Sequence, residues 1–431
     1  MKNFLLTVMF LMLLSVTAMA QWEYAGPWPD ASYKGGSHGV VVDPDGKIWQ
    51  ASYYRSNWTT PTGDVILCTP IYVFNPDGSL LDSIGIVTTG GVVDTLGNST
   101  STSGTRGLAK DESGNILWCA SGPGRIIKID YQTRQGIARH DFQAGEIGSS
   151  PTKPGVTSDG TIFVGPVVGN GSPDAKIAMF ATDLTYQGEA VVGPPAIART
   201  MDVSSDGLAI YWTVFTGDHQ GMYIYTRPSE FDPFVLADSV LEGMSIESVA
   251  WHPVTGNLWV SNDARGTGGY GHLTWYEFDI TTRTLVDSFT LVDPDTTLSD
   301  DLPRAIAFSN DGATAYVGVF GTGYDRIYRF DNTTSVDDQG QVVVNGYKLS
   351  QNYPNPFNPS TKITFELPAS GYVSLKVYDM LGREVAELAS GEMTSGTHSV
   401  NFNASDLASG TYIYRLTANG NVLTNKMLLL K

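Results

Sequence analysis

One short sequence motif occurs six times between residues 38 and 318 of this 431-residue chain. Each copy is an apolar run, a polar turn that ends in Gly, and a second apolar run, as in HGVVVDPDGKIWQAS (38–52). Because Gly supplies the positive φ that a tight turn needs, each copy predicts a β-hairpin. The turn glycines are Gly46, Gly114, Gly160, Gly207, Gly256 and Gly312, at intervals of 68, 46, 47, 49 and 56 residues.

Repeats of about 40–50 residues that contain several strands are typical of a β-propeller, whose blades must stack because one blade cannot bury its own faces. Each hairpin is followed by a third and a fourth strand, except that the sixth repeat has no fourth. Trp22–Tyr24 precedes the first repeat as an unattached strand, and we expect it to complete blade six beside Arg326–Phe330. The ring then closes without a long open edge. The extra Thr, Gly, Ser and Asn residues between Thr88 and Thr105 are too few for a seventh blade, so we interpret them as insertions on blade one.

The first 20 residues predict a secretory signal peptide. Lys2 gives the positive start, Phe4–Val16 the apolar stretch, and Ala18-Met19-Ala20 the small-residue cleavage site. This apolar stretch is shorter than the ~20 residues that a membrane anchor needs. We therefore expect an exported chain that begins near Gln21 and has no other membrane-spanning stretch.

The charge of the chain is uneven. Residues 21–340 contain 18 Lys and Arg against 38 Asp and Glu, whereas residues 341–431 are nearly neutral. An acidic body repels phosphate backbones, which argues against nucleic acid as a partner. The two cysteines, Cys68 and Cys119, would enter an oxidising compartment. They form either a disulfide or two buried thiols that behave as small apolar side chains.

The last 85 residues differ in composition: a Pro- and Asn-rich opening is followed by segments in which apolar and polar residues alternate, as in β-strands. NYPNPFNPSTKITFELP, VYDMLGREV, LASGTYIYRL and the final KMLLLK resemble the type A C-terminal sorting domain of type IX secretion, and the opening also resembles the Ig-like domain of flagellar hook-capping proteins. The resemblance implies passage across the outer membrane of a Gram-negative bacterium by the type IX machinery. The passenger is then released or anchored at the surface, commonly with loss of the domain. The repeats themselves resemble those of NHL-type propellers.

Together these features predict an all-β chain, a six-bladed β-propeller followed by a small Ig-like β-sandwich. The expected divisions are a signal peptide (1–20), the propeller (21–332), a linker (333–346) and the C-terminal sorting domain (347–431).

Alignment of the repeats provides a candidate ligand site. The residues that open the innermost strands should converge on one mouth of the central channel: His38, Arg106, Lys153 or Pro154, Arg199, Glu247 and Arg304. Three arginines in an acidic body suit a carboxylate, a sulfate or a sugar. The alternative is structural, in which each Arg ties neighbouring blades together, because repeat proteins reuse one stabilising residue per repeat.

Three functions remain open from the sequence. The first is a non-enzymatic binding module for a carbohydrate, a small anion or a protein. The second is a metal-dependent hydrolase or lyase of the lactonase type, for which Glu247, Asn262 and Asp263 supply only part of a metal site. The third is a structural subunit of a surface layer or filament. Asp293, Asp295, Asp300 and Asp301 form either a Ca²⁺ site or, since they lack the Gly and Glu of an EF-hand loop, a solvated acidic turn.

Overall fold

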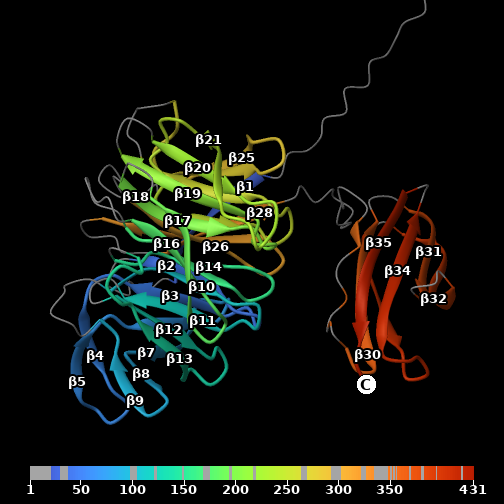
Figure 1. The fold of residues 1–431 in the computed structure, drawn as a ribbon, viewed down its shortest axis with the longest axis horizontal. Helices are drawn as coiled ribbons and strands as arrows, with labels where there is room; N and C mark the ends of the chain where they lie inside the picture. Colours follow the sequence, from blue (N-terminus) through green and yellow to red (C-terminus); the bar gives the residue numbers. More distant parts are fainter. Residues whose placement is uncertain are drawn as a thin grey trace, which may run out of the picture. The chain divides into compact units, whose positions relative to one another are not determined.

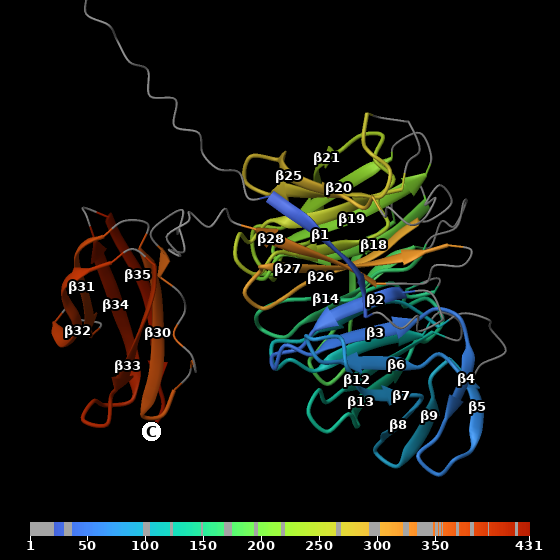
Figure 2. The same ribbon diagram turned by 180° about the vertical axis from the view of Figure 1, so that it is seen from behind.

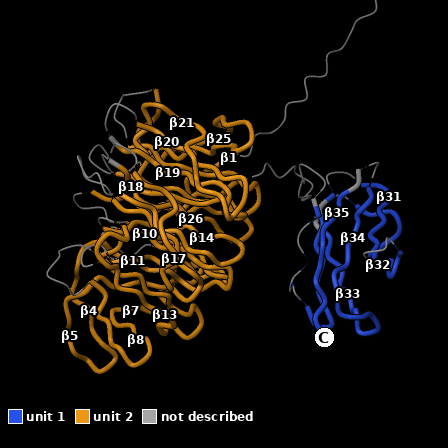
Figure 3. The backbone as a smooth tube through the Cα atoms, viewed as in Figure 1, with its two compact units in different colours: residues 1–21, 333–431 blue, residues 22–332 orange. Residues whose placement is uncertain are grey.

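The computed structural model divides the chain into two compact units, one of residues 22–332 and one that contains residues 333–431 (Figure 3). The described residues are 21–29, 37–97, 104–120, 124–147, 150–167, 175–193, 197–216, 220–263, 269–292, 302–321, 327–333, 348–349, 352, 355, 357–367, 370–379, 383–394, 396–418 and 421–431. The expected signal peptide and nearly all of the expected linker lie outside them.

The first unit is a six-bladed β-propeller, and its innermost strands contact one another in order round a closed ring. Figure 1 labels strands from each of the six blades. From the innermost strand outward, blade one is β2 (Ser37–Val42), β3 (Ile48–Ser52), β6 (Ile71–Phe74) and β7 (Leu80–Ile84), and blade two is β10 (Thr105–Lys110), β11 (Ile116–Ala120), β12 (Arg125–Ile129) and β13 (Gly136–Asp141). Blade three is β14 (Gly155–Val156), β15 (Ile162–Val164), β16 (Lys176–Phe180) and β17 (Tyr186–Val192), and blade four is β18 (Ile197–Val203), β19 (Ala209–Thr216), β20 (Gly221–Thr226) and β21 (Val235–Val240). Blade five is β22 (Val249–Trp251), β23 (Leu258–Asn262), β24 (Thr274–Asp279) and β25 (Thr284–Thr290), and blade six is β26 (Leu302–Phe308), β27 (Thr314–Phe320), β28 (Ile327–Thr333) and β1 (Gln21–Trp28).

The repeated motif forms the inner hairpin of every blade. All six turn glycines have positive φ, between 70° and 87°, which confirms the predicted turns. Each second strand buries a large aromatic side chain between neighbouring sheets: Trp49, Trp118, Phe163, Trp212, Trp259 and Tyr316. These rings supply much of the apolar area that holds the stacked blades together.

The N-terminal strand closes the ring as predicted. β1 is the outermost strand of blade six, next to β28 (Figure 2). Trp22 reaches blade five, where its indole N–H donates to Asp287 Oδ2 at 3.1 Å and its ring lies 5.5 Å from that of Trp259. Tyr24 packs on Phe330 of β28 at 5.6 Å. The strand is therefore fixed by aromatic packing as well as by backbone pairing.

Two additional hairpins extend the blades, and only the second overlaps the insertion expected between Thr88 and Thr105. β4 (Ser56–Thr59) pairs with β5 (Val65–Cys68) between the second and third strands of blade one. β8 (Ile86–Thr89) and β9 (Val92–Thr95) extend blade two instead, because Thr89 pairs with Gly136 at its outer edge. Asp94 on β9 fixes this position through an ion pair to Arg125 of β12.

The cysteines do not form the disulfide considered above; both are free and fully buried. The reason is the alternation of side chains along β11. Trp118 faces blade one, whereas Cys119 faces the opposite way, into the apolar cluster shared with Ile162 and Ala178 of blade three. Cys68 packs beside Trp58 and Gly85 at the inserted hairpin. The Cys119 thiol therefore points away from blade one, to which the hairpin of Cys68 belongs.

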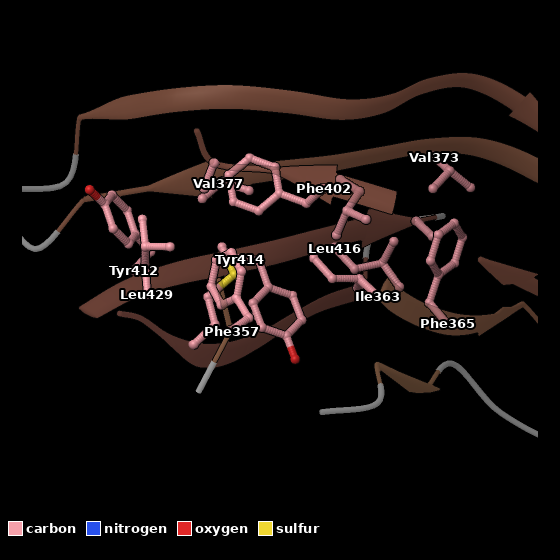
Figure 4. Close-up of a cluster of buried hydrophobic side chains, with 14 of the residues drawn as sticks. Phe357, Ile363, Phe365, Val373, Val377, Phe402, Tyr412, Tyr414, Leu416 and Leu429 are labelled. Atoms are coloured by element: carbon pink, nitrogen blue, oxygen red, sulfur yellow. The ribbon is translucent and has the colours of Figure 1, made fainter. Parts of the chain in front are cut away.

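The second unit is a small β-sandwich of two sheets, one of β29 (Lys348–Leu349), β30 (Ser360–Leu367) and β33 (Gly396–Asn403), and one of β32 (Glu384–Met393), β31 (Gly371–Tyr378), β34 (Gly410–Ala418) and β35 (Asn421–Leu429). Alternate side chains of these strands meet in one core (Figure 4). Val373, Leu375 and Val377 point inward along β31, which is the period-two pattern of a strand with one buried face.

The Pro- and Asn-rich opening of this unit is held against its last strands. Asn352 donates its backbone N–H to the hydroxyl of Tyr414 at 2.9 Å, and Asn355 accepts from the N–H of Leu428 at 2.8 Å. Phe357 exchanges backbone hydrogen bonds with Leu428 and Leu430. The side chain of Asn355 therefore substitutes for a missing strand pair, whereas Asn352 is held to Tyr414 through its backbone.

Candidate functional site

The residues that open the innermost strands converge on one mouth of the channel, which we call the charged mouth: His38, Arg106, Arg199, Glu247 and Arg304. A void of about 10 Å³ between them is lined by His38, Arg106, Glu247 and Arg304, and Arg199 lies beside Glu247. Glycine after the opening residue makes this convergence possible. A Cβ at Gly39 would lie 2.9 Å from Leu108, and one at Gly107 would lie 2.5 Å from Lys153 Cβ, so neighbouring inner strands approach closely only without it.

Glu247 joins three blades. Its Oε1 lies 3.7 Å from Arg199 Nε on blade four and 3.4 Å from Arg304 Nη1 on blade six. The carboxylate side chain is only 5% exposed, so the pairing is shielded from water. Arg304 also approaches Asp263 Oδ2 at 3.6 Å and donates to the carbonyl of Pro303 at 2.9 Å. These two arginines therefore have the blade-tying role that the sequence left open.

His38 is held by aromatic rings. Its imidazole stacks on Tyr53 with centroids 4.3 Å apart and meets the edge of Phe320 at 4.9 Å. Burial, followed by the nearby charges of Arg304, Arg106 and Arg199, holds its pKa well below the ordinary value. Its Nε2 is buried and has no hydrogen-bond partner among the described residues. A neutral imidazole therefore faces the charged mouth.

Arg106 differs from the other two arginines because no carboxylate lies within ion-pair distance of it in the described part of the chain. Its guanidinium lies over the ring of Tyr53 at 5.3 Å, and its Nη2 is 3.3 Å from the Tyr53 hydroxyl. Its Nε is buried without a hydrogen-bond partner in the same region. Burial lowers the pKa of this guanidinium, since the charge is removed from water without a matching anion. Among the described residues, three arginines stand against Glu247 and Asp263, which leaves one positive charge of the charged mouth without a carboxylate.

The weak metal hypothesis does not fit the contacts. Glu247 is occupied by two arginines, and Asn262 accepts from Ser245 N–H at 3.1 Å and donates to the Gly271 carbonyl at 2.9 Å. Asp263 lies beside Arg304. A divalent cation would have to displace guanidinium groups from this set, and no group of three or more His, Cys, Asp or Glu suited to a metal is found among the described residues. The acidic stretch considered for Ca²⁺ lies within residues 293–301, outside the described residues.

Lys153, one of the residues expected to converge here, and Trp58 are both engaged elsewhere. Trp58 is buried at the inserted hairpin, where its indole N–H donates to Ser83 at 2.9 Å. Lys153 turns toward blade four and forms an ion pair with Asp202.

Two aromatic residues of the charged mouth escaped the sequence analysis. Phe215 and Phe320 end the second strands of blades four and six and lie under Arg199 and Arg304 at 4.9 and 5.5 Å. The signal that could have found them is their equivalent place in the repeats, one strand after each arginine.

The C-terminal unit identifies the destination of the protein. Residues 351–430 match the family model of the secretion system C-terminal sorting domain. The protein is therefore exported. As the motifs implied, this type IX signal sends it to the cell surface, or releases it, in a Gram-negative bacterium. Among the described residues, no helix has the length and apolarity needed to cross a lipid bilayer.

Solved structures resemble the chain in fold alone. PorZ of Porphyromonas gingivalis, a surface component of the type IX secretion system, is 16% identical with a TM-score of 0.42. The match covers 92% of this chain and 52% of PorZ, so the chain spans about half the length of that protein. A gluconolactonase from Xanthomonas campestris is 14% identical (TM-score 0.44; 72% of this chain, 94% of that one), and virginiamycin B lyase from Staphylococcus aureus is 12% identical (0.42; 72% and 99%). A search of curated protein sequences finds no match.

Proposed function

We propose that the protein is a binding module that works outside the cell, and that the charged mouth receives a carboxylate or sulfate group of its ligand. The observation that carries this proposal is the unmatched guanidinium of Arg106. Arg106 is partly buried and contacts only the neutral Tyr53, so its charge has no counter-ion among the described residues. A charge desolvated without a counter-ion destabilises a fold, and such groups are retained where they serve function. A planar acidic group would supply the missing anion and accept paired hydrogen bonds from the guanidinium.

The size of the void limits how the ligand binds. A space of about 10 Å³ holds roughly one water molecule, so no ring or chain enters the channel from this side. The acidic group instead caps the void while the remainder of the ligand lies on the rim. Tyr54 is 44% exposed there and stacks on Phe320 at 5.3 Å, which offers an aromatic face to that remainder.

The domain divisions belong to the same proposal. Removal of residues 1–20 leaves a chain that begins at β1, and residues 333–346 link the propeller to the sorting domain, whose Ig-like character we also infer. PorZ, which has a similar fold, is a surface component of its secretion system. Neither the hydrolase nor the filament alternative has a specific contact that favours it.

Calorimetric titration of the exported chain with glucuronate and with glucose tests the proposal. We expect glucuronate to bind and glucose to bind at least about tenfold more weakly at the charged mouth, because only the acid matches Arg106. Arg106→Gln should remove the preference, whereas Arg329→Gln, which breaks only a partly exposed pair with Asp331, should keep it. Equal binding of glucuronate to Arg106→Gln and to the parent chain would refute the assignment.

A further inference from the structure

The other end of the channel contains the larger cavity, of about 510 Å³, which we call the chamber. It lies where the innermost strands end and their hairpin turns begin, at the opposite ends of the strands from the charged mouth. Its inner wall is apolar: Val40, Leu108, Val156, Ala250, Ile306 and Phe308. Ligand sites typically enclose about 300–1,000 Å³ with mostly apolar walls and a few polar groups, so the chamber has the dimensions of a site.

Its rim has polar groups that the fold leaves partly unused. Lys110 Nζ donates to the Val42 carbonyl at 2.9 Å and to Asn310 Oδ1 at 3.2 Å, which leaves one of its three N–H groups. Glu112 and Ser205 line the chamber, and neither side chain makes a hydrogen bond or ion pair in the described part of the chain. The rim therefore presents both donors and acceptors to whatever fills the chamber.

The charge of the rim selects against acids. Lys110 and Lys153 are outnumbered by Glu112, Asp202 and Asp206, and Lys153 is already paired with Asp202. An anionic ligand would meet one excess negative charge here, in a chain whose formal charge is −18. Mixed donors and acceptors without an excess of positive charge match a neutral ligand that is rich in hydroxyl groups.

Trp251 provides an apolar surface beside these polar groups. Its indole N–H donates to the Val203 carbonyl at 3.0 Å, and its ring meets the edge of Tyr211 at 5.4 Å. Both contacts fix the ring, which remains only half-buried where it lines the chamber. The C–H face of a sugar ring is apolar while its edge carries hydroxyl groups, so a sugar uses both kinds of surface at once.

From these features we infer that the chamber is a second ligand site, for a neutral sugar, separate from the charged mouth. The sugar enters from the side of the hairpin turns, lays a C–H face on Trp251, and exchanges hydrogen bonds with Lys110, Glu112 and Ser205. This assignment does not depend on the proposed function, because it uses none of the residues of the charged mouth.

Saturation-transfer NMR of the exported chain with glucose, galactose, mannose, N-acetylglucosamine, maltose, lactose and cellobiose tests the inference. At least one sugar should bind, and Ser205→Trp should weaken its binding at least about tenfold by filling the entrance. Gln132→Trp, on an exposed turn outside the chamber, is the matched control and should bind as the parent does. Thermal melting should show both variants folded, because Ser205 and Gln132 are exposed.

Glu112→Gln and Arg106→Gln separate the two sites. Glu112→Gln replaces a charged acceptor by a weaker neutral one and should weaken binding of the neutral sugar severalfold, whereas Arg106→Gln should leave it unchanged. Absence of binding for every sugar at 50 mM, a concentration about fifty times a Kd of 1 mM, would overturn the inference. So would binding that survives Ser205→Trp or that is abolished by Arg106→Gln.

Discussion

Replacing Glu247 and Arg106 separately by Gln should produce opposite results, although the two residues lie in one cluster. Glu247 joins Arg199 and Arg304 with its carboxylate only 5% exposed. Removing one partner of a buried ion pair costs about 3–5 kcal/mol, because the remaining charges stay buried without compensation. We expect about 3 kcal/mol for Glu247→Gln, since the amide still accepts a hydrogen bond.

The corresponding change in melting temperature follows from the size of the propeller. Unfolding entropy of about 2.1 cal/mol/K per residue gives about 650 cal/mol/K for a unit of roughly 310 residues, so Glu247→Gln should lower Tm by about 5 °C. Arg106 has no ion pair to lose within the described part of the chain, so Arg106→Gln should change Tm by less than about 1 °C, or raise it.

Differential scanning calorimetry of the exported chain measures both variants. The propeller transition is the one to follow, and Arg329→Gln serves as the control for loss of a partly exposed guanidinium. If Arg106→Gln lowers Tm as much as Glu247→Gln does, Arg106 is a blade tie like its neighbours. The unmatched charge that supports the proposed function would then not exist.

Three further outcomes follow from the structure. Burial raises the pKa of Cys68 to about 11 and raises that of Cys119 further, so both thiols should react with iodoacetamide only after denaturation. The chain should have the same gel mobility with and without reductant, and a mobility shift on reduction would show a disulfide. Because the pKa of buried His38 is lowered, the unfolded chain binds a proton below pH 6.5 that the folded chain does not, and the free energy of unfolding should fall by up to about 2 kcal/mol between pH 6.5 and 5. In chemical denaturation the free energy of unfolding of His38→Asn should fall less over this range, and an equal fall in the variant and the parent would contradict the assignment. Gly114→Ala should destabilise the propeller more than Gly46→Ala, since both glycines have positive φ but only a Cβ at Gly114 would clash with a neighbour, Pro44 Cγ at 2.2 Å. A lower urea midpoint for Gly46→Ala than for Gly114→Ala would refute this.

The sequence predicts the fold correctly at positions where a residue type or an unpaired strand has only one structural role. Gly after a polar turn predicts the inner hairpins, and the lone Trp22–Tyr24 strand predicts the closure, because a ring with five complete blades and one short blade needs it. The β8–β9 hairpin was assigned to the wrong blade for a physical reason. Its attachment depends on Asp94 meeting Arg125, an ion pair between positions that no local pattern connects.

The candidate sites show the same limit more sharply. Every innermost strand leaves backbone groups unpaired toward the channel, so polar side chains are needed at both ends of it whether or not a ligand binds. Lys110 donates to the Val42 carbonyl, Trp251 to the Val203 carbonyl and Arg304 to the Pro303 carbonyl. A repeated Arg in the sequence therefore predicts position but not role.

A structural polar residue differs from a ligand-binding one in how many of its charges and hydrogen-bonding groups are paired within the fold. Arg199 and Arg304 share Glu247, and Lys153 has Asp202, so their charges are accounted for within the fold. Arg106 at one end of the channel and Glu112 at the other have no such partner in the described residues, and they differ in sign. We therefore propose that the two ends of the channel prefer ligands of different charge, an acid at the charged mouth and a neutral sugar in the chamber. An acid that bound in the chamber, or a neutral sugar that required Arg106, would show that the partner count does not distinguish a binding residue from a structural one.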